Sequence, residues 1–284
     1  MRTELKGLNE ADQFEQHYQQ WSRLRSGAQL DRYLQSEDID RRFFRGMLAD
    51  ACRRVTGTVP EQPLRVLELG CGPALDLFWL SRAFGADCLG LDISSKALGF
   101  AREVQDRAGG KATLVRGDAH HMPFASGSCD LVYSQGVLEH FRDPNPVLQE
   151  QVRALRQGGI LVICVPQKYN TYTWNKHRLM RQGKWSWGWE TEFSPRGLRA
   201  LGRKAGLQPL RTRGFGYEGA LRIARSAYRL VRKKTPGLSG PLFRLVDQAY
   251  YGALDPLVEG AWGAIERAVG PNLLINVVVT FRKP

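Results

Sequence analysis

Three acidic residues and one serine lie at positions along the chain from which they could together form a ligand site: Glu68, Asp92, Asp118 and Ser134. A carboxylate can accept hydrogen bonds from two neighbouring hydroxyl groups, and it attracts a cationic ligand. Glu68 lies in an apolar run, where a buried acid usually needs a cationic or hydrogen-bonding partner. A ligand ammonium group is one such partner, and a solvated glutamate at a strand end is the alternative.

A glycine turn follows Glu68 directly. Gly70 and Gly72 permit a positive φ and let the backbone approach a ligand without an intervening Cβ atom. Pro73 suits the first position of a helix, where its missing N–H group is no loss. The stretch 65–73 therefore predicts a buried strand, a tight turn that could cradle a ligand, and the start of a helix.

Apolar runs alternate with helical patterns from residue 64 onward, which predicts βα units around a parallel, doubly wound sheet. In such sheets, ligands bind beyond the carboxyl ends of the strands. The four polar residues fall at or just past those ends, which is the strongest indication of a site. We expect strands at 64–69, 87–92, 112–116, 130–134, 160–165, 208–212 and 273–281, and helices at 73–84, 94–107, 145–155 and 195–205.

The chain divides into three parts by pattern. Residues 1–60 predict N-terminal helices, residues 61–213 with 273–284 form the α/β core, and residues 214–272 predict a helical cap inserted before the last strand. The aromatic-rich stretch 167–193 has no clean periodicity and predicts a long loop or lid, which could line an acceptor pocket or pack under the cap. Its two acids, Glu190 and Glu192, could meet a substrate amine or balance Lys184 and Arg196.

Composition excludes several classes of protein. The apolar fraction is 43%, no apolar run reaches 18 residues, and the first residues are polar, so we expect no transmembrane helix and no secretory signal. Five scattered cysteines without a CxxC pair predict reduced thiols in a cytoplasmic protein.

The net charge is +13, and the block from Arg196 to Lys234 holds twelve Lys and Arg against Glu218 alone. Such a block could face a membrane, a nucleic acid or an acidic substrate, or it could simply be solvated.

A dinucleotide-binding fold is the first alternative for the glycine turn. Its GxGxxG fingerprint needs a third small residue, whereas this chain has Leu75 there. Glu68 would also be an awkward neighbour for a doubly anionic pyrophosphate. A ligand that carries a sulfonium and an ammonium group, such as S-adenosylmethionine, suits this carboxylate better.

The chain resembles the class I S-adenosylmethionine-dependent methyltransferases over about residues 60–215 and the last strand. Four ordered segments carry the resemblance: 68–72, Asp92, 117–119 and 134–140. It implies a Rossmann-like methyltransferase fold with a seven-stranded, mostly parallel sheet. It also implies that the glycine loop wraps the methionine part of the cofactor, that Asp92 binds the ribose, that the third segment binds adenine, and that the fourth approaches the methyl group. The cofactor-binding residues that it implies are Glu68, Gly70, Cys71, Gly72, Asp92, Ile93, Asp118, Ala119, Ser134 and Gln135.

His140 is the candidate general base, because a histidine of ordinary pKa can remove a proton near neutral pH. A structural hydrogen-bonding role is the alternative. Glu139 and His140 also resemble part of a metal site in the quinone-biosynthesis O-methyltransferases. Gly136 stands where those enzymes have a further acid, so we expect no metal. We also expect His120 and His121 to be ordinary loop residues.

The resemblance predicts an enzyme that moves a methyl group to an O or N atom of a small or lipophilic metabolite by in-line displacement. One alternative is a membrane-borne lipid or quinone-like acceptor, with the basic segment 217–234 in peripheral contact with anionic head groups at the inner face of a membrane. Another is a regulator that binds the cofactor without turnover. A nucleic-acid partner is not expected, since no binding module for it is visible. The acceptor and the oligomeric state stay open.

Overall fold

The computed structural model describes residues 39–56, 63–185, 190–216 and 274–284. These residues form a seven-stranded sheet with the order β3-β2-β1-β4-β5-β7-β6. Neighbours pair in parallel except at β7, which is antiparallel to both β5 and β6. The predicted α/β fold with a mostly parallel sheet is confirmed. The strands are β1 Arg65–Leu69, β2 Asp87–Asp92, β3 Thr113–Arg116, β4 Cys129–Gln135, β5 Leu155–Pro166, β6 Gln208–Phe215 and β7 Asn276–Arg282.

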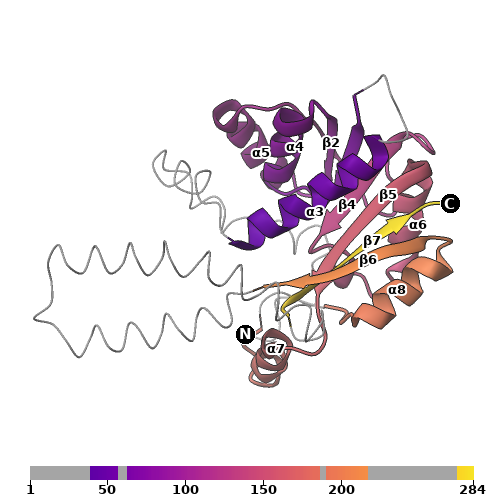
Figure 1. The fold of residues 1–284 in the computed structure, drawn as a ribbon. Coiled ribbons are helices and arrows are strands. Elements are labelled where there is room, and N and C mark those ends of the chain that lie inside the picture. Colours follow the sequence, from indigo (N-terminus) through magenta and orange to yellow (C-terminus); the bar gives the residue numbers. More distant parts are fainter. Residues whose placement is uncertain (1–38, 57–62, 186–189, 217–273) are drawn as a thin grey trace, which may run out of the picture.

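Helices cover both faces of the sheet (Figure 1). One apolar cluster joins the sheet to α3, α4 and α5, and a second joins the opposite face to α6 and α8. Burial of both faces explains why the central strands are continuous apolar runs instead of alternating ones. The helices are α3 Ile39–Thr56, α4 Leu75–Phe84, α5 Ser95–Ala108, α6 Asn145–Ala154, α7 Thr171–Arg181 and α8 Pro195–Lys204, with a 3-10 turn η2 at Leu138–His140.

Two helix starts follow the expected capping chemistry. The Ser94 hydroxyl accepts a hydrogen bond from Ala97 N at 3.1 Å at the start of α5. The Ser194 hydroxyl accepts one from Gly197 N at 3.0 Å at the start of α8. In each case a side-chain oxygen satisfies one of the backbone donors that a helix leaves unpaired at its N-terminus.

Two expectations for local structure were wrong. Helix α4 begins at Leu75, after Ala74 in a left-handed conformation with φ 55°, so Pro73 lies in the turn and not in the helix. The aromatic stretch after β5 is not only a loop, because it contains α7. The N-cap of that helix is Asn170, whose side-chain oxygen accepts a hydrogen bond from Thr173 N at 2.9 Å.

Several predictions concern residues outside the described parts of the chain. These include the N-terminal segment 1–38, Trp187 and Trp189, and nearly all of the cap insertion 214–272. At the edge of that insertion, β6 runs on to Phe215, which pairs with Asn276 of β7, so the sheet extends past residue 213. Within the described residues, no helix has the length and apolar character needed to cross a bilayer.

Candidate active site

The glycine turn after β1 is tied to the end of β2 by backbone hydrogen bonds. Gly70 N and Cys71 N both donate to Leu91 O, at 2.8 and 3.0 Å. Gly70 and Gly72 have φ of 66° and 49°, as predicted. A Cβ atom on Gly70 would lie 2.4 Å from Val137 Cγ2, so the close approach of this turn to the segment after β4 requires glycine.

Asp92 ends β2 with its carboxylate fixed from two sides. One oxygen accepts a hydrogen bond from Gly72 N at 2.8 Å and the other accepts from Ser94 N at 2.9 Å. The residue is only 5% exposed, so its orientation is set before any ligand arrives. Each carboxylate oxygen has a second lone pair, which leaves it able to accept from a ligand hydroxyl.

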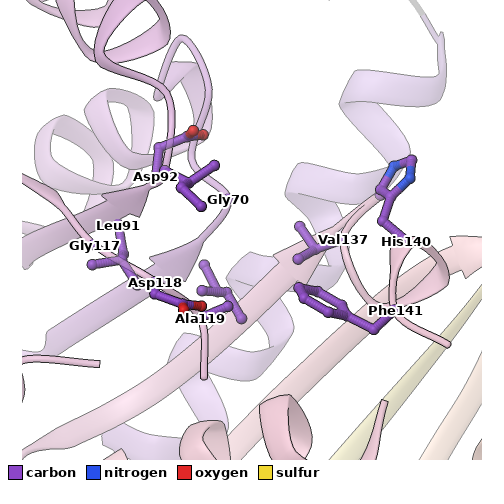
Figure 2. Close-up of a pocket in the computed structure, with 12 residues that line it drawn as sticks. Gly70, Leu91, Asp92, Gly117, Asp118, Ala119, Val137, His140 and Phe141 are labelled. Atoms are coloured by element: carbon purple, nitrogen blue, oxygen red, sulfur yellow. The ribbon is translucent and has the colours of Figure 1, made fainter. Parts of the chain in front are cut away.

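A pocket opens at the carboxyl ends of β1, β2 and β4, as expected for a parallel sheet. Gly70 and Asp92 lie on one side of it, and Val137 and Phe141 lie across from them (Figure 2). The lining is mostly apolar, with a few polar groups at its edge. The lining residues are Leu69, Gly70, Leu91, Asp92, Ile93, Gly117, Asp118, Ala119, Gly136, Val137, His140 and Phe141.

The pocket brings together part of the predicted site. Gly70, Asp92, Ile93, Asp118, Ala119 and His140 line it, although they come from four separate stretches of sequence. The other residues named from the sequence do not line it: Glu68, Cys71, Gly72, Ser134 and Gln135. Gly72 acts on the pocket indirectly, because its N–H group holds Asp92.

Glu68 lies on the face of the sheet that packs against α3, α4 and α5. Its neighbours Leu67 and Leu69 belong to the apolar cluster on the other face, and side chains alternate along a strand. Burial raises the pKa of Glu68 well above its ordinary value, and the charges of Asp76 and Asp92 add to that rise. Among the described residues, Glu68 Oε2 has no hydrogen-bond partner. Contact of Glu68 with a ligand ammonium therefore stays a prediction.

Asp118 turns back onto its own loop. His120 N donates to Asp118 Oδ1 at 2.9 Å, and His120 Nδ1 lies 3.0 Å from the same oxygen. Partial burial acts to raise the pKa of Asp118, but these hydrogen bonds outweigh it and bring the pKa below its ordinary value. The His120 ring also packs edge-on against Phe141, with centroids 5.1 Å apart. His120 thus links the loops on two sides of the pocket, which the sequence analysis did not foresee.

His140 lies in η2, where its N–H group donates to Val137 O at 3.1 Å. His140 is among the residues that line the pocket, which is where a base that acts on a bound acceptor would have to lie. The preceding residue, Glu139, is buried, and Oε2 of its carboxyl has no hydrogen-bond partner in the described part of the chain. Burial raises the pKa of Glu139 to about 8. Across residues 39–56, 63–185, 190–216 and 274–284, no group of three His, Cys, Asp or Glu side chains could hold a metal ion.

The two acids of the aromatic stretch pair with α7. Lys176 Nζ lies 3.4 Å from Glu190 Oε2 and 3.2 Å from Glu192 Oε1, and His177 also contacts Glu192. Of the two alternatives for these acids, the pairing with Lys184 and Arg196 is not the one observed, because Lys176 and His177 are the partners; contact with a substrate amine stays a prediction. Because Thr191 N donates to Glu139 O at 2.6 Å, the same segment is joined to η2 and so to the edge of the pocket.

Comparisons with known proteins agree with this geometry. Residues 67–163 match the methyltransferase domain family. The chain is 32% identical over 124 residues to methyltransferase GfsG of Streptomyces halstedii, covering 41% of this chain and 45% of that protein. It is 29% identical over 172 residues to the ubiquinone biosynthesis O-methyltransferase of Cereibacter sphaeroides, covering 59% and 69% of the two chains. The chain thus spans less than half the length of the first of these relatives.

Among solved structures, a putative sarcosine dimethylglycine methyltransferase from Galdieria sulphuraria matches with a TM-score of 0.59 at 20% identity. The match covers 97% of this chain and 98% of that one, and it shows a shared fold. The fold of the chain is thus the Rossmann-like fold of that structure. Residues 67–163 therefore match the methyltransferase domain family, and the chain is similar in sequence to named methyltransferases.

Proposed function

We propose that this protein transfers the methyl group of S-adenosylmethionine to an O or N atom of a small or lipophilic acceptor. The observation that carries the proposal is the Asp92 carboxylate, which two backbone N–H groups hold at the edge of a mostly apolar pocket. A fixed, buried acceptor of this kind suits the two hydroxyl groups of a ribose. The names of the relatives, which include an O-methyltransferase, support transfer to such acceptors.

The residues around the pocket fit the other parts of the cofactor. Leu91, Val137 and Phe141 offer apolar surfaces to the adenine ring, and Ala119 N–H with the Asp118 carboxylate offers polar partners at its edge. Gly70 lines the pocket at the turn, where the methionine portion would lie. We keep Glu68, Cys71, Ser134 and Gln135 as proposed partners of that portion, to be tested by substitution.

The cofactor supplies an activated methyl group, so the protein has to position the acceptor and keep water out. The acceptor atom attacks the methyl carbon, the carbon–sulfur bond breaks, and the electron pair stays on sulfur. If the attacking atom is a hydroxyl oxygen, its proton must leave. His140, which lines the pocket, is the proposed receiver of that proton.

Two measurements test the proposal. Calorimetry with S-adenosylhomocysteine should show binding by the wild type and much weaker binding by Asp92→Asn. A labelled-methyl assay against metabolite and membrane extracts should then trap an acceptor, and His140→Ala should lower turnover while it leaves cofactor affinity unchanged. Binding without any transfer would favour the cofactor-binding regulator. Labelling confined to the membrane extract would favour a lipid or quinone-like acceptor, and no binding at all would overturn the proposal.

A further inference from the structure

A second concave site lies between α8 and the outer edge of the sheet. It is a groove that shares no lining residue with the cofactor pocket. Four arginines line it, three from α8 and one from β6, and no acidic residue does. The lining residues are Pro195, Arg196, Arg199, Arg203, Pro209, Leu210, Arg211 and Thr212.

Helix α8 holds its arginines toward the groove because its other face is fixed in the core. Leu198 is completely buried and Leu201 packs against the same apolar cluster. Arg196, Arg199 and Arg203 are three and four residues apart, which places them on one side of a helix. The backbone that carries these side chains is therefore held in place by packing, independently of any ligand.

The arrangement does not favour the stability of the helix itself. Like charges four residues apart, as at Arg199 and Arg203, repel one another. Arg196 lies in the first turn, where the helix dipole disfavours a cation. The helix dipole favours a cation at Arg203 in the last turn but not at Arg196, so the stability of the helix does not account for the whole set of arginines.

The charge of the groove is not balanced by the described part of the chain. Arg196, Arg199 and Arg203 make no ion pair with any described residue, and Arg199 Nε is buried without a hydrogen-bond acceptor there. Among these four arginines, Arg211 alone has an acidic partner in the part of the chain that the structure describes, Asp50 at 3.5 Å. A buried donor without an acceptor is costly, and an anionic oxygen in the groove would satisfy it.

The edge of the sheet adds a second source of donors. β6 is the last strand in the sheet order, so within the described residues no strand pairs with its outer side. Residues 209–212 of this strand line the groove. Backbone N–H groups along such an edge can supplement guanidinium groups in binding an anion.

We propose that this groove binds phosphate groups. Guanidinium forks match the geometry of phosphate oxygens and can bind them in pairs, and several arginines on two elements suit a ligand with more than one anionic oxygen. The phosphate could belong to the head group of an anionic phospholipid or to a soluble phosphorylated ligand. The site is separate from the proposed methyl-transfer site and does not depend on it.

The test compares the full chain with two double variants. Arg199→Gln with Arg203→Gln removes two charges from the groove. Arg102→Gln with Lys111→Gln removes two charges from exposed positions outside it. Calorimetry with pyrophosphate and co-sedimentation with vesicles of phosphatidylcholine and phosphatidylglycerol in equal parts report the two phosphate sources. Affinity for S-adenosylhomocysteine, which neither variant should change, confirms that each protein is folded.

We expect the groove variant to bind pyrophosphate or the mixed vesicles about tenfold more weakly or worse, and the control variant to bind like the wild type. Loss of pyrophosphate binding identifies a soluble ligand as the source, and loss of vesicle binding alone identifies the lipid head group. Equal weakening in both variants would show a general effect of net charge and would overturn the proposal. Wild-type binding by the groove variant, or no binding of either probe by the wild type, would overturn it as well.

Discussion

Lys176 and Glu190 form an ion pair with Nζ and Oε2 3.4 Å apart, and both side chains are almost completely buried, at 3% and 5% exposed. The pair joins α7 to the segment that precedes α8. Because Glu192 lies 3.2 Å from the same ammonium, two carboxylates share the single charge of Lys176, and His177 also contacts Glu192. Lys176 is therefore the buried cation among the contacts that hold α7 in this part of the molecule.

Lys176→Met should strongly destabilise the protein. It would leave two carboxylates without their lysine in a largely buried place, and loss of one partner from such a pair costs about 3–5 kcal/mol. Urea unfolding would measure the change. Lys184→Met, at an exposed position beyond the same helix, should cost less than about 0.5 kcal/mol. Similar costs for both variants would show that the buried pair contributes little.

The stability of the protein should fall as pH rises from about 4.5 toward 8, in part because of Glu139. Its pKa is about 8 in the folded protein against an ordinary value of 4.5, so within this window the unfolded chain releases a proton that the folded chain keeps. The loss is at most about 1.4 kcal/mol per pH unit from this one group. Glu139→Gln removes this group, so its stability relative to the wild type should improve between pH 5 and pH 7 in urea titrations. A constant difference would show that Glu139 titrates normally.

Asp92→Asn should weaken binding of S-adenosylhomocysteine about a hundredfold. The amide cannot accept from both Gly72 N and Ser94 N without turning an NH₂ group toward one of them, so the turn and the ribose site are both disturbed. Asp87→Asn, at the exposed opposite end of the same strand, is the matched control and should bind normally. Calorimetry distinguishes the two. If both variants bound alike, Asp92 would not be a cofactor contact.

Gly70→Ala should cost more stability than Gly85→Ala, although both glycines have nearly the same φ, 66° and 62°. The left-handed conformation costs about 1–2 kcal/mol for alanine at either site. A Cβ on Gly70 also meets Val137 at 2.4 Å, whereas one on Gly85 meets nothing within 4 Å, so overpacking should add about 1–3 kcal/mol at Gly70 alone.

The addition of Val137→Ala tests the cause of that difference. If the contact with Val137 is responsible, the double variant Gly70→Ala with Val137→Ala should be more stable than the sum of the single changes predicts. Additive costs in thermal or urea unfolding would place the strain elsewhere in the turn.

The sheet could be predicted because its central strands are buried on both faces. Strands such as β1 and β4 are then short apolar runs bounded by turns, which sequence patterns identify well. Helix α7 could not be predicted in this way. Its sequence lacks an apolar stripe, and it is held by contacts with distant parts of the chain, which include the hydrogen bond from Asn170 Nδ2 to Leu274 O and the ion pair of the buried Lys176.

The candidate site was only partly predictable for a related reason. Asp92 and Asp118 follow strands, so the topology brings them to one edge of the sheet. Glu68 also lies near a strand end, but the sequence could not tell which face of a doubly covered sheet its side chain would take. Val137 and Phe141, which flank η2, reach the pocket only because η2 folds back beside the glycine turn. The same fold brings Phe141 into contact with the ring of His120.

The position of β7 also constrains how the chain can be made. This strand lies between β5 and β6 and supplies partners to both, yet it is separated from β6 by the long insertion. During synthesis, β6 therefore leaves the ribosome well before the segment that will bond to it. Until residue 282 has emerged, the edges of β5 and β6 that will pair with β7 are both unpaired. During this interval a chaperone or a misfolding partner could bind to them.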